Sequence, residues 1–251
     1  MEAPALKPPV RLSISHHLRQ TAARALALAF AGQAFCDDWT FQSVVETGVK
    51  SGDVDARKHR LTNTKLPLKT PIAIGVGSRI EVCNDLFVLR AGGGTTVEFL
   101  GERTLNLKNG VILLDPKGEK QEMTVKTERA EFKIGGQSCS LVEATSNGGA
   151  KVICLSGKSA VSTVAATTRS LLPGNLLFCL PDKKSFGPQL DIDLRLLQRT
   201  SLLINGFPTP SIRSKEIRAA AFYQAHKVRS KSNAIVGDAK SDNRYDVIFV
   251  K

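Results

Sequence analysis

MTVKTERAEFKIGGQSC, residues 123–139, decides the predicted fold class. Apolar and polar residues alternate in both halves of this stretch, which is the pattern of a strand with one buried face. The apolar residues fall on odd numbers in the first half and on even numbers in the second, and they are Met123, Val125, Ala130, Phe132 and Ile134. The change of phase at Glu128-Arg129 predicts a bulge or a corner between two strands, and Gly135-Gly136 predicts another turn.

The same rhythm extends in both directions along the chain. Alternating apolar residues begin at Ile72, and glycine-rich turns interrupt them at residues 92–94, 101, 109–110, 118, 135–136, 147–149 and 157. Such close turns leave no room for helices between Ile72 and Val164. The pattern predicts an all-β region of about ten to twelve short strands, solenoid-like or jelly-roll-like. KVICL, residues 151–155, is apolar on both faces and predicts a strand enclosed between two layers.

Helices are expected only after the β region. In LDIDLRLLQRTSLLINGF, residues 190–207, Asp191 or Asp193 can cap a helix and Gly206 can end it, so one short helix is predicted near residues 191–205. A basic helix is also indicated after Ser214. We expect much of residues 205–251 to be loosely held or to form an appendage.

The N-terminus has the layout of a secretory signal peptide. Four basic residues and one acid precede the apolar run ALALAFAGQAF, and small residues follow, which predicts a signal peptide over residues 1–34 with cleavage after Ala34 or after Ala31. An amphipathic helix of a cytosolic domain is the alternative. A span of the bilayer is not expected after processing, because the apolar run is short. The protein is therefore expected to be periplasmic or secreted.

Charge and cysteine content limit the partners. The net charge of +12 points to polyanionic surroundings. Export would disfavour nucleic acid as a partner and favour anionic envelope material. The simple alternative is that the charge serves only to keep the protein soluble. The five cysteines have no paired spacing, and the four after Cys36 lie in apolar runs, so we interpret them mainly as small buried residues. A bridge between Cys139 and Cys154 is conceivable. A hairpin turning near Gly148 would not set these two directly opposite each other.

Residues 79–168 resemble the FecR-domain family of bacterial envelope proteins. The resemblance lies in NLKNGVILLD, MTVKTERAEFKIGGQSCSLVE and GGAKVICLSGKSAVST, in which strands end in glycine and a Val-x-Thr strand precedes a turn. LLPGNLLFCLPD and IDLRLLQRTSLL are similar to an extension of exported FecR-like proteins. The resemblance implies an extracytoplasmic, solenoid-like β domain. In the regulators of this family it relays a signal from a receptor to a sigma-factor regulator, and we carry over the fold and the compartment but not those partners.

No catalytic, cofactor-binding or metal-binding residue is predicted. The histidines His59 and His226 have no second ligand at metal-binding spacing, and His16 and His17 fall in the predicted signal peptide. GVGSR, residues 75–79, precedes a strand pattern and not a helix, so it is interpreted as a turn and not as a phosphate loop. Asp191 and Asp193 precede a helix and are better explained by capping than by acid–base chemistry.

One group of residues could bind a partner. It contains Arg213, Lys215, Arg218, Lys227, Arg229 and Lys231, with Phe222 and Tyr223 among them. It could attract an anionic glycan, a lipid headgroup or a protein, although a solvated basic helix is the simpler explanation.

These features together predict four parts. They are a signal peptide (1–34), an N-terminal strand (41–46) with a linker (35–71), a FecR-like β domain with a short helix (72–206) and a basic C-terminal appendage (207–251). The expected function is non-enzymatic, through contacts with an envelope protein in sensing, assembly or scaffolding. The alternative is a binding module for acidic envelope polysaccharide.

Overall fold

The computed structural model describes residues 38–45, 49–51, 54–55, 63–118, 120–182, 184–208, 213–231, 234–235 and 248–249. Contacts divide the chain into two compact units, Met1–Cys36 and Asp37–Lys251, and all the described residues belong to the second. The predicted signal peptide and Cys36 lie outside the described residues. Within these ranges, no helix is both long and apolar enough to cross a membrane.

The stretch over residues 123–139 forms the hairpin that its pattern predicts. β10 (Glu122–Lys126) and β11 (Glu131–Gly135) are antiparallel, with Met123 opposite Ile134 and Val125 opposite Phe132. All four side chains are buried, because both apolar sets face the same core. The phase change is the corner between the strands, where the Thr127 hydroxyl accepts from a backbone N–H and donates to a backbone carbonyl. The prediction of two strands joined by a corner is confirmed.

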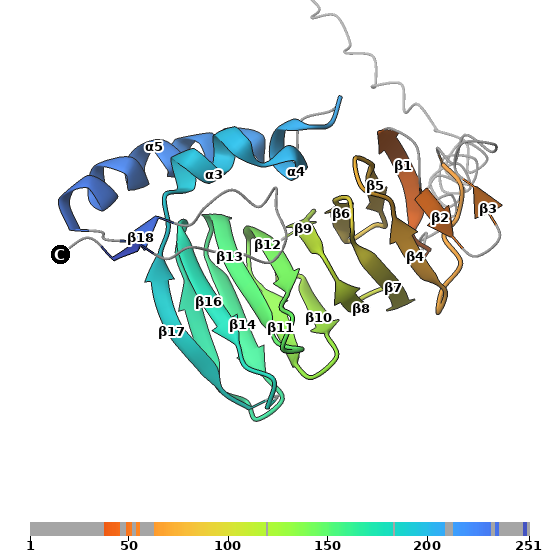
Figure 1. The fold of residues 1–251 in the computed structure, drawn as a ribbon, viewed down its shortest axis with the longest axis horizontal. Helices are drawn as coiled ribbons and strands as arrows, with labels where there is room; N and C mark the ends of the chain where they lie inside the picture. The colour runs from red at the N-terminus through yellow and green to blue at the C-terminus, as the bar shows by residue number, and fades with distance from the viewer. Residues whose placement is uncertain are drawn as a thin grey trace, which may run out of the picture. The chain divides into compact units, whose positions relative to one another are not determined.

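Two large sheets make up the β body (Figure 1). Sheet A contains, in spatial order, β1 (Thr40–Val45), β5 (Arg79–Cys83), β6 (Phe87–Ala91), β9 (Val111–Pro116), β12 (Ser138–Ala144), β13 (Ala150–Gly157), β16 (Asn175–Cys179) and β17 (Phe186–Asp191). Sheet B contains β15 (Thr168–Leu171), β14 (Ser159–Thr163), β11, β10, β8 (Thr104–Asn109), β7 (Thr96–Gly101), β4 (Pro71–Ile74), β2 (Val49–Ser51) and β3 (Val54–Asp55). A separate pair contains β18 (Ala234–Ile235) and β19 (Ile248–Phe249).

The chain coils between the sheets as it advances. After β5 and β6 in sheet A it places β7 and β8 in sheet B, returns for β9, and continues in this alternation to β17. Neighbouring strands of both sheets are antiparallel except β8 and β10, which are parallel because β9 intervenes between them in the chain. The predicted all-β class is confirmed. The described residues between Ile72 and Val164 form only strands and turns.

The β domain predicted over residues 72–206 contains fourteen strands, β4 to β17, where about ten to twelve were predicted. Glycine spacing misses turns that contain no glycine. Asn84, for example, turns the chain from β5 to β6 by accepting from the N–H groups of Leu86 and Phe87 at 3.0 and 2.8 Å. The segment predicted as a linker also contributes the short strands β2 and β3.

The central strands of sheet A, β6, β9, β12 and β13, are buried on both faces. One apolar cluster fills the space between the sheets and includes Val152 and Cys154, whereas Ile153 and Leu155 belong to a second cluster under the helices. The prediction that KVICL is enclosed between two layers is therefore confirmed. The molecule has three layers in the order sheet B, sheet A and helices.

In the helical layer, the single short helix expected near residues 191–205 is divided into two. The layer contains α3 (Leu194–Thr200), α4 (Leu202–Asn205) and α5 (Ser214–Lys231). α3 and α4 are separate because Ser201 between them has extended backbone angles, φ −71° and ψ 117°. The prediction of a cap is confirmed, with Asp193 accepting from the N–H of Leu196 at 2.9 Å.

Part of the segment after Gly206 packs against the β body. Phe207, Ile217 and Ala221 are buried in the cluster on the outer face of sheet A. The basic helix predicted after Ser214 is present, and its first half packs on the β body. It packs there because Ile217, Ala221 and Gln224, spaced three and four residues apart, lie on one side of the helix and are buried.

The cysteines fit their interpretation as small buried residues. Cys83, Cys139, Cys154 and Cys179 are free thiols, and the last three are buried. Cys139 lies in the cluster under the helices and Cys154 in the core between the sheets, on opposite faces of sheet A. The conceivable bridge between these two is therefore absent.

Candidate interaction surface

A buried ion pair lies under the start of the helical layer. Arg90 in β6 is fully buried, and its Nε is 2.6 Å from Oε2 of Glu81 on the neighbouring strand. The same guanidinium donates to the carbonyl oxygens of Leu203 and Ile204 at 3.1 and 3.3 Å, and it lies 4.4 Å from the ring centre of Phe207. Arg90 therefore compensates the orphan carbonyls of the short helix α4 and fixes α4 on sheet A.

A second buried carboxylate fixes the start of α5. Asp115 in β9 is fully buried and accepts from Nε of Arg213 at 3.1 Å and from its backbone N–H at 3.3 Å. Arg213 also donates to the carbonyl of Pro116 at 3.2 Å. Burial raises the pKa of Asp115 to about 6, although the positive charges of Arg213 and Arg90 act in the opposite direction.

The middle of α5 is attached to the turn before α3. The side chain of Gln224 accepts from the N–H of Leu194 at 2.9 Å and donates to the carbonyl of Ile192. Asp191 nearby accepts from the amide of Asn175 at 2.6 Å. The two hydrogen bonds of Gln224 therefore hold α5 against the start of α3.

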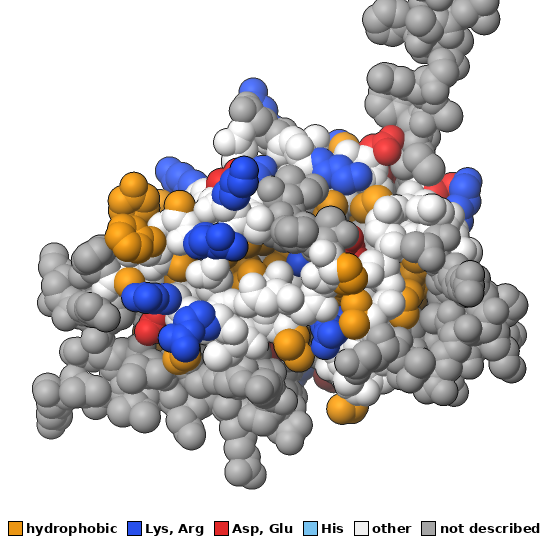
Figure 2. All heavy atoms as spheres, turned by 90° about the horizontal axis from the view of Figure 1, so that it is seen from above, with side chains coloured by type: hydrophobic (Ala, Val, Ile, Leu, Met, Phe, Trp, Pro, Cys, Tyr) orange, Lys and Arg blue, Asp and Glu red, His pale blue; other side chains and the backbone are white. Residues whose placement is uncertain are grey.

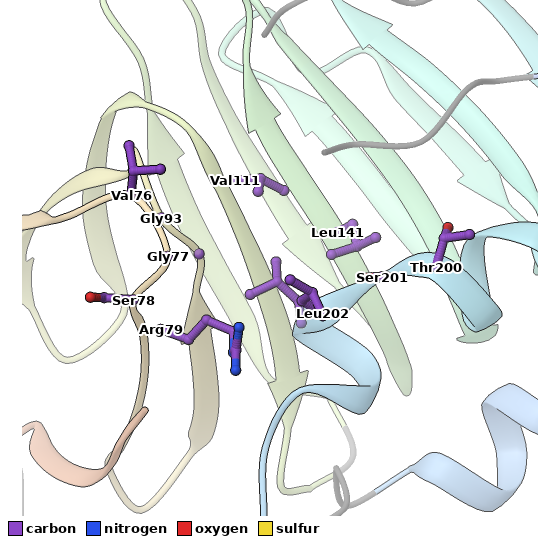
Figure 3. A pocket seen from close by; sticks show the side chains of 12 residues that line it. Val76, Gly77, Ser78, Arg79, Gly93, Val111, Leu141, Thr200, Ser201 and Leu202 are labelled. Carbon is purple, nitrogen blue, oxygen red and sulfur yellow. The ribbon is translucent and has the colours of Figure 1, made fainter. Parts of the chain in front are cut away.

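A small apolar cavity lies where α4 meets two loops of the β body. It has a volume of about 180 Å³, and its lining comes from the β4–β5 turn, the end of β6, β9, β12 and the α3–α4 junction. Figure 3 shows Val111 and Leu141 projecting from the sheet toward Leu202, with Arg79 reaching toward the same space from β5. Nε of Arg79 donates to the carbonyl of Gly206 at 3.2 Å.

The rim of this cavity exposes apolar side chains. Val76 is 93% exposed and Leu202 is 50% exposed. Single exposed apolar residues are ordinary on a protein surface, but these two both line the mouth of an apolar cavity.

The outward face of α3 and α5 is basic and carries two aromatic side chains. Phe222 and Tyr223 are 62% and 74% exposed, with ring centres 5.9 Å apart in an edge-to-face arrangement. Among the side chains of the two helices that the structure describes, the exposed basic ones are Arg195, Arg199, Lys215 and Arg218. Glu216 is the single acidic residue of α3, α4 and α5. Figure 2, which looks onto this layer, shows basic and hydrophobic side chains spread over it and fewer acidic ones.

The outer face of sheet B has a different chemistry. Several of its charges are paired across strands, with Lys133 3.1 Å from Glu122 and Lys126 3.4 Å from Glu131. A shallow hollow of about 420 Å³ lies there among hydroxyl and charged side chains, and the aromatic residue in its lining, Phe132, is buried. The hollow therefore presents neither a ring on which a sugar could stack nor an excess of positive charge.

The structure assigns a place to most of the candidate site residues named from the sequence. GVGSR is a turn between β4 and β5, as expected, and it forms one wall of the cavity. Asp191 accepts a hydrogen bond from the side-chain amide of Asn175, and Asp193 caps the N-terminus of α3. Arg213, which we placed in the basic binding group, is instead used inside the fold. His59 and the side chains of His226, Lys227, Arg229 and Lys231 lie outside the described residues.

No group of three potential metal ligands occurs among the residues that the structure describes. Sequence patterns do not predict the cavity, because its walls come from segments more than a hundred residues apart. The one local signal was the exposed valine in GVGSR.

Comparisons with known proteins give a partial likeness. No known family profile and no curated protein matches the sequence. Two crystal structures of a protein described as a "putative anti-sigma factor" from Parabacteroides distasonis ATCC 8503 are similar, each at 18% sequence identity, with TM-scores of 0.39 and 0.38. Each alignment covers 49% of this chain and 59% of the other, so this chain spans about three fifths of that protein's length.

Proposed function

We propose that this protein is an exported, non-enzymatic FecR-like domain that acts by binding another protein of the cell envelope through its helical layer. The observation that carries the proposal is the exposed Tyr223 and Phe222 pair on a rigid helix, flanked by basic side chains. Aromatic and arginine side chains supply most of the binding free energy at protein interfaces.

The rigidity of the layer supports this role. Arg90, Arg213 and Gln224 each join a helix to a strand or to another helix, so a partner would meet a preformed surface. A preformed surface loses less conformational entropy on binding than a mobile one. On the other large face, sheet B, several charges are paired across strands, and Phe99 and Phe132 are buried.

The test is quantitative affinity capture from the native cells. Wild-type protein is compared with Tyr223→Asp on the helical face and with Val164→Asp, a matched control on the loop after β14, where Val164 is 64% exposed. We expect one envelope protein to be captured by the wild type and by Val164→Asp, and to be reduced at least about tenfold by Tyr223→Asp. Equal capture by all three proteins would contradict the proposal.

Export is tested in the same preparation. Sequencing of the mature N-terminus is expected to find Phe35 or, after the earlier cleavage, Gly32 as the first residue. An intact N-terminus in the cytosol would contradict export.

Binding of an acidic polysaccharide is a second candidate, and the excess of basic over acidic side chains on α3 and α5 favours it. Its signature is affinity for the purified polysaccharide that falls steeply with salt. Charge reversal at Arg218 should weaken such binding more than loss of the Tyr223 ring.

A further inference from the structure

We propose that the cavity between α4 and the β4–β5 turn receives one large apolar side chain from an acidic segment of the partner protein. This inference rests on the proposed function and names the chemistry of the partner. It concerns a different part of the helical layer from Tyr223, so the two can fail separately.

The size of the cavity fits a side chain. Pockets for small-molecule ligands commonly have volumes of roughly 300–1,000 Å³, whereas this cavity has about 180 Å³. It is too small for a cofactor. Burial of a single anchor residue in a preformed pocket is the usual arrangement of an interface hot spot.

The lining of the cavity selects an apolar group. Val111, Leu141, Leu202 and Leu203 supply its side-chain walls, and glycine backbone forms much of the remainder. A buried polar group would find few partners there and would lose its hydrogen bonds to water. The exposed Val76 and the half-exposed Leu202 extend the apolar surface beyond the mouth, where the flanking residues of a partner would lie.

The charge at the cavity selects an acidic segment. Arg79 is the one ionisable residue among those that line it. One nitrogen of its guanidinium is used by the carbonyl of Gly206, and its two terminal nitrogens make no hydrogen bond to the described part of the chain. Arg199 is exposed on the adjoining turn of α3, and the whole chain carries a net charge of +12. A carboxylate beside the inserted side chain could pair with Arg79 in a bidentate manner.

The chain offers a variant that narrows the cavity without disturbing its walls. A Cβ added at Gly92 would lie 3.6 Å from Leu203 Cδ2 and 3.7 Å from Val111 Cγ1, which are ordinary contacts. Both contacted residues line the cavity, so Gly92→Ala should fill part of it and leave the fold intact. Val76→Asp places a negative charge on the rim, at a position so exposed that folding should not be affected.

The experiment selects a display library of random twelve-residue peptides on the immobilised full chain. We expect enriched peptides to share one large apolar residue with Asp or Glu beside it. A synthetic peptide of the enriched sequence should bind at least about tenfold more weakly to Gly92→Ala and Val76→Asp, and equally well to Val164→Asp. Arg79→Gln, which keeps an N–H donor but removes the charge, should reduce the preference for acidic over neutral peptides.

Three results would overturn the inference. They are enrichment without an apolar position, enrichment of basic peptides, or binding that is unchanged in both Gly92→Ala and Val76→Asp. Circular dichroism of each variant establishes that it is folded. If a native partner is captured in a Tyr223-dependent manner while the peptides show no dependence on the cavity, only the cavity inference fails.

Discussion

Arg213, at the start of the C-terminal helix α5, forms an ion pair with Asp115 in the middle of sheet A, with Nε 3.1 Å from Oδ1. The two residues are 98 positions apart in the chain. The pair attaches the start of α5, in a segment rich in basic residues, to the folded β body. It also places a carboxylate in a fully buried position, which has a consequence for pH dependence.

Stability should change with pH through Asp115. Burial raises its pKa to about 6 from an ordinary value of 3.8. The folded state therefore binds this proton more tightly than the unfolded state, so the contribution of Asp115 to the free energy of unfolding is fully present below about pH 4 and is lost as the pH rises through 6. Asp115→Asn lacks this proton but keeps an oxygen acceptor toward Arg213. Urea unfolding at about pH 5 and pH 7 should show that the wild type gains roughly 1 kcal/mol over Asp115→Asn at the lower pH. An equal difference at both pH values would contradict the assignment.

Removal of the buried guanidinium of Arg90 should be severe. Arg90→Met leaves Glu81 without its partner and deprives the carbonyls of Leu203 and Ile204 of a donor, so the free energy of unfolding should fall by about 3–5 kcal/mol. The control is Lys133→Met, which breaks an ion pair whose side chains are 56% and 48% exposed. That change should cost less than about 1 kcal/mol. Similar losses in the two variants would show that Arg90 does not hold α4 on the sheet.

Gly157, which ends β13, should not tolerate a side chain. Its φ of +73° is in the left-handed region, and a Cβ there would lie 1.7 Å from the carbonyl oxygen of Gln137. Gly157→Ala should lower the free energy of unfolding by about 3 kcal/mol or more, because the backbone on one side must move. Gly101→Ala is the control, since a Cβ at Gly101 meets nothing within 4 Å, and its effect should stay within about 0.5 kcal/mol.

The packing of α5 can be measured with two alanine substitutions on one helix. Ile217 is fully buried, so Ile217→Ala should cost about 2–5 kcal/mol in thermal or denaturant unfolding. Tyr223→Ala on the outward face should change stability by less than about 0.5 kcal/mol, because that side chain is 74% exposed. A small effect at Ile217 would mean that α5 is the loosely held appendage that its composition suggests.

Local patterns were sufficient to predict the strands and many of the turns. Alternation of apolar residues identified the hairpin that contains Met123 and Phe132, because a period of two is the pattern of a strand with one buried face. The double-sided pattern of KVICL identified a covered sheet. It did not identify what covers the sheet, since an apolar outer face is compatible with several partners.

The interaction surface was harder to predict because long-range pairing creates it. Arg213 looked like a member of a basic surface group, and only the buried Asp115 shows otherwise. Arg90 was a weak local signal, as a charged residue inside the apolar strand FVLRA. The break at Ser201, which gives α4 its separate direction, has no signal in helix propensity, since serine is compatible with a helix interior.

The most direct test of the central claim is photo-crosslinking in the native cells, with a photoreactive amino acid placed at Tyr223 on the helical face or at Ser170 on β15 of sheet B. Both positions are exposed. The account predicts a covalent adduct with one envelope protein from position 223 and none from position 170. Equal adducts from both positions, adducts only from position 170, or no protein adduct from either would contradict a protein-binding role for the helical layer.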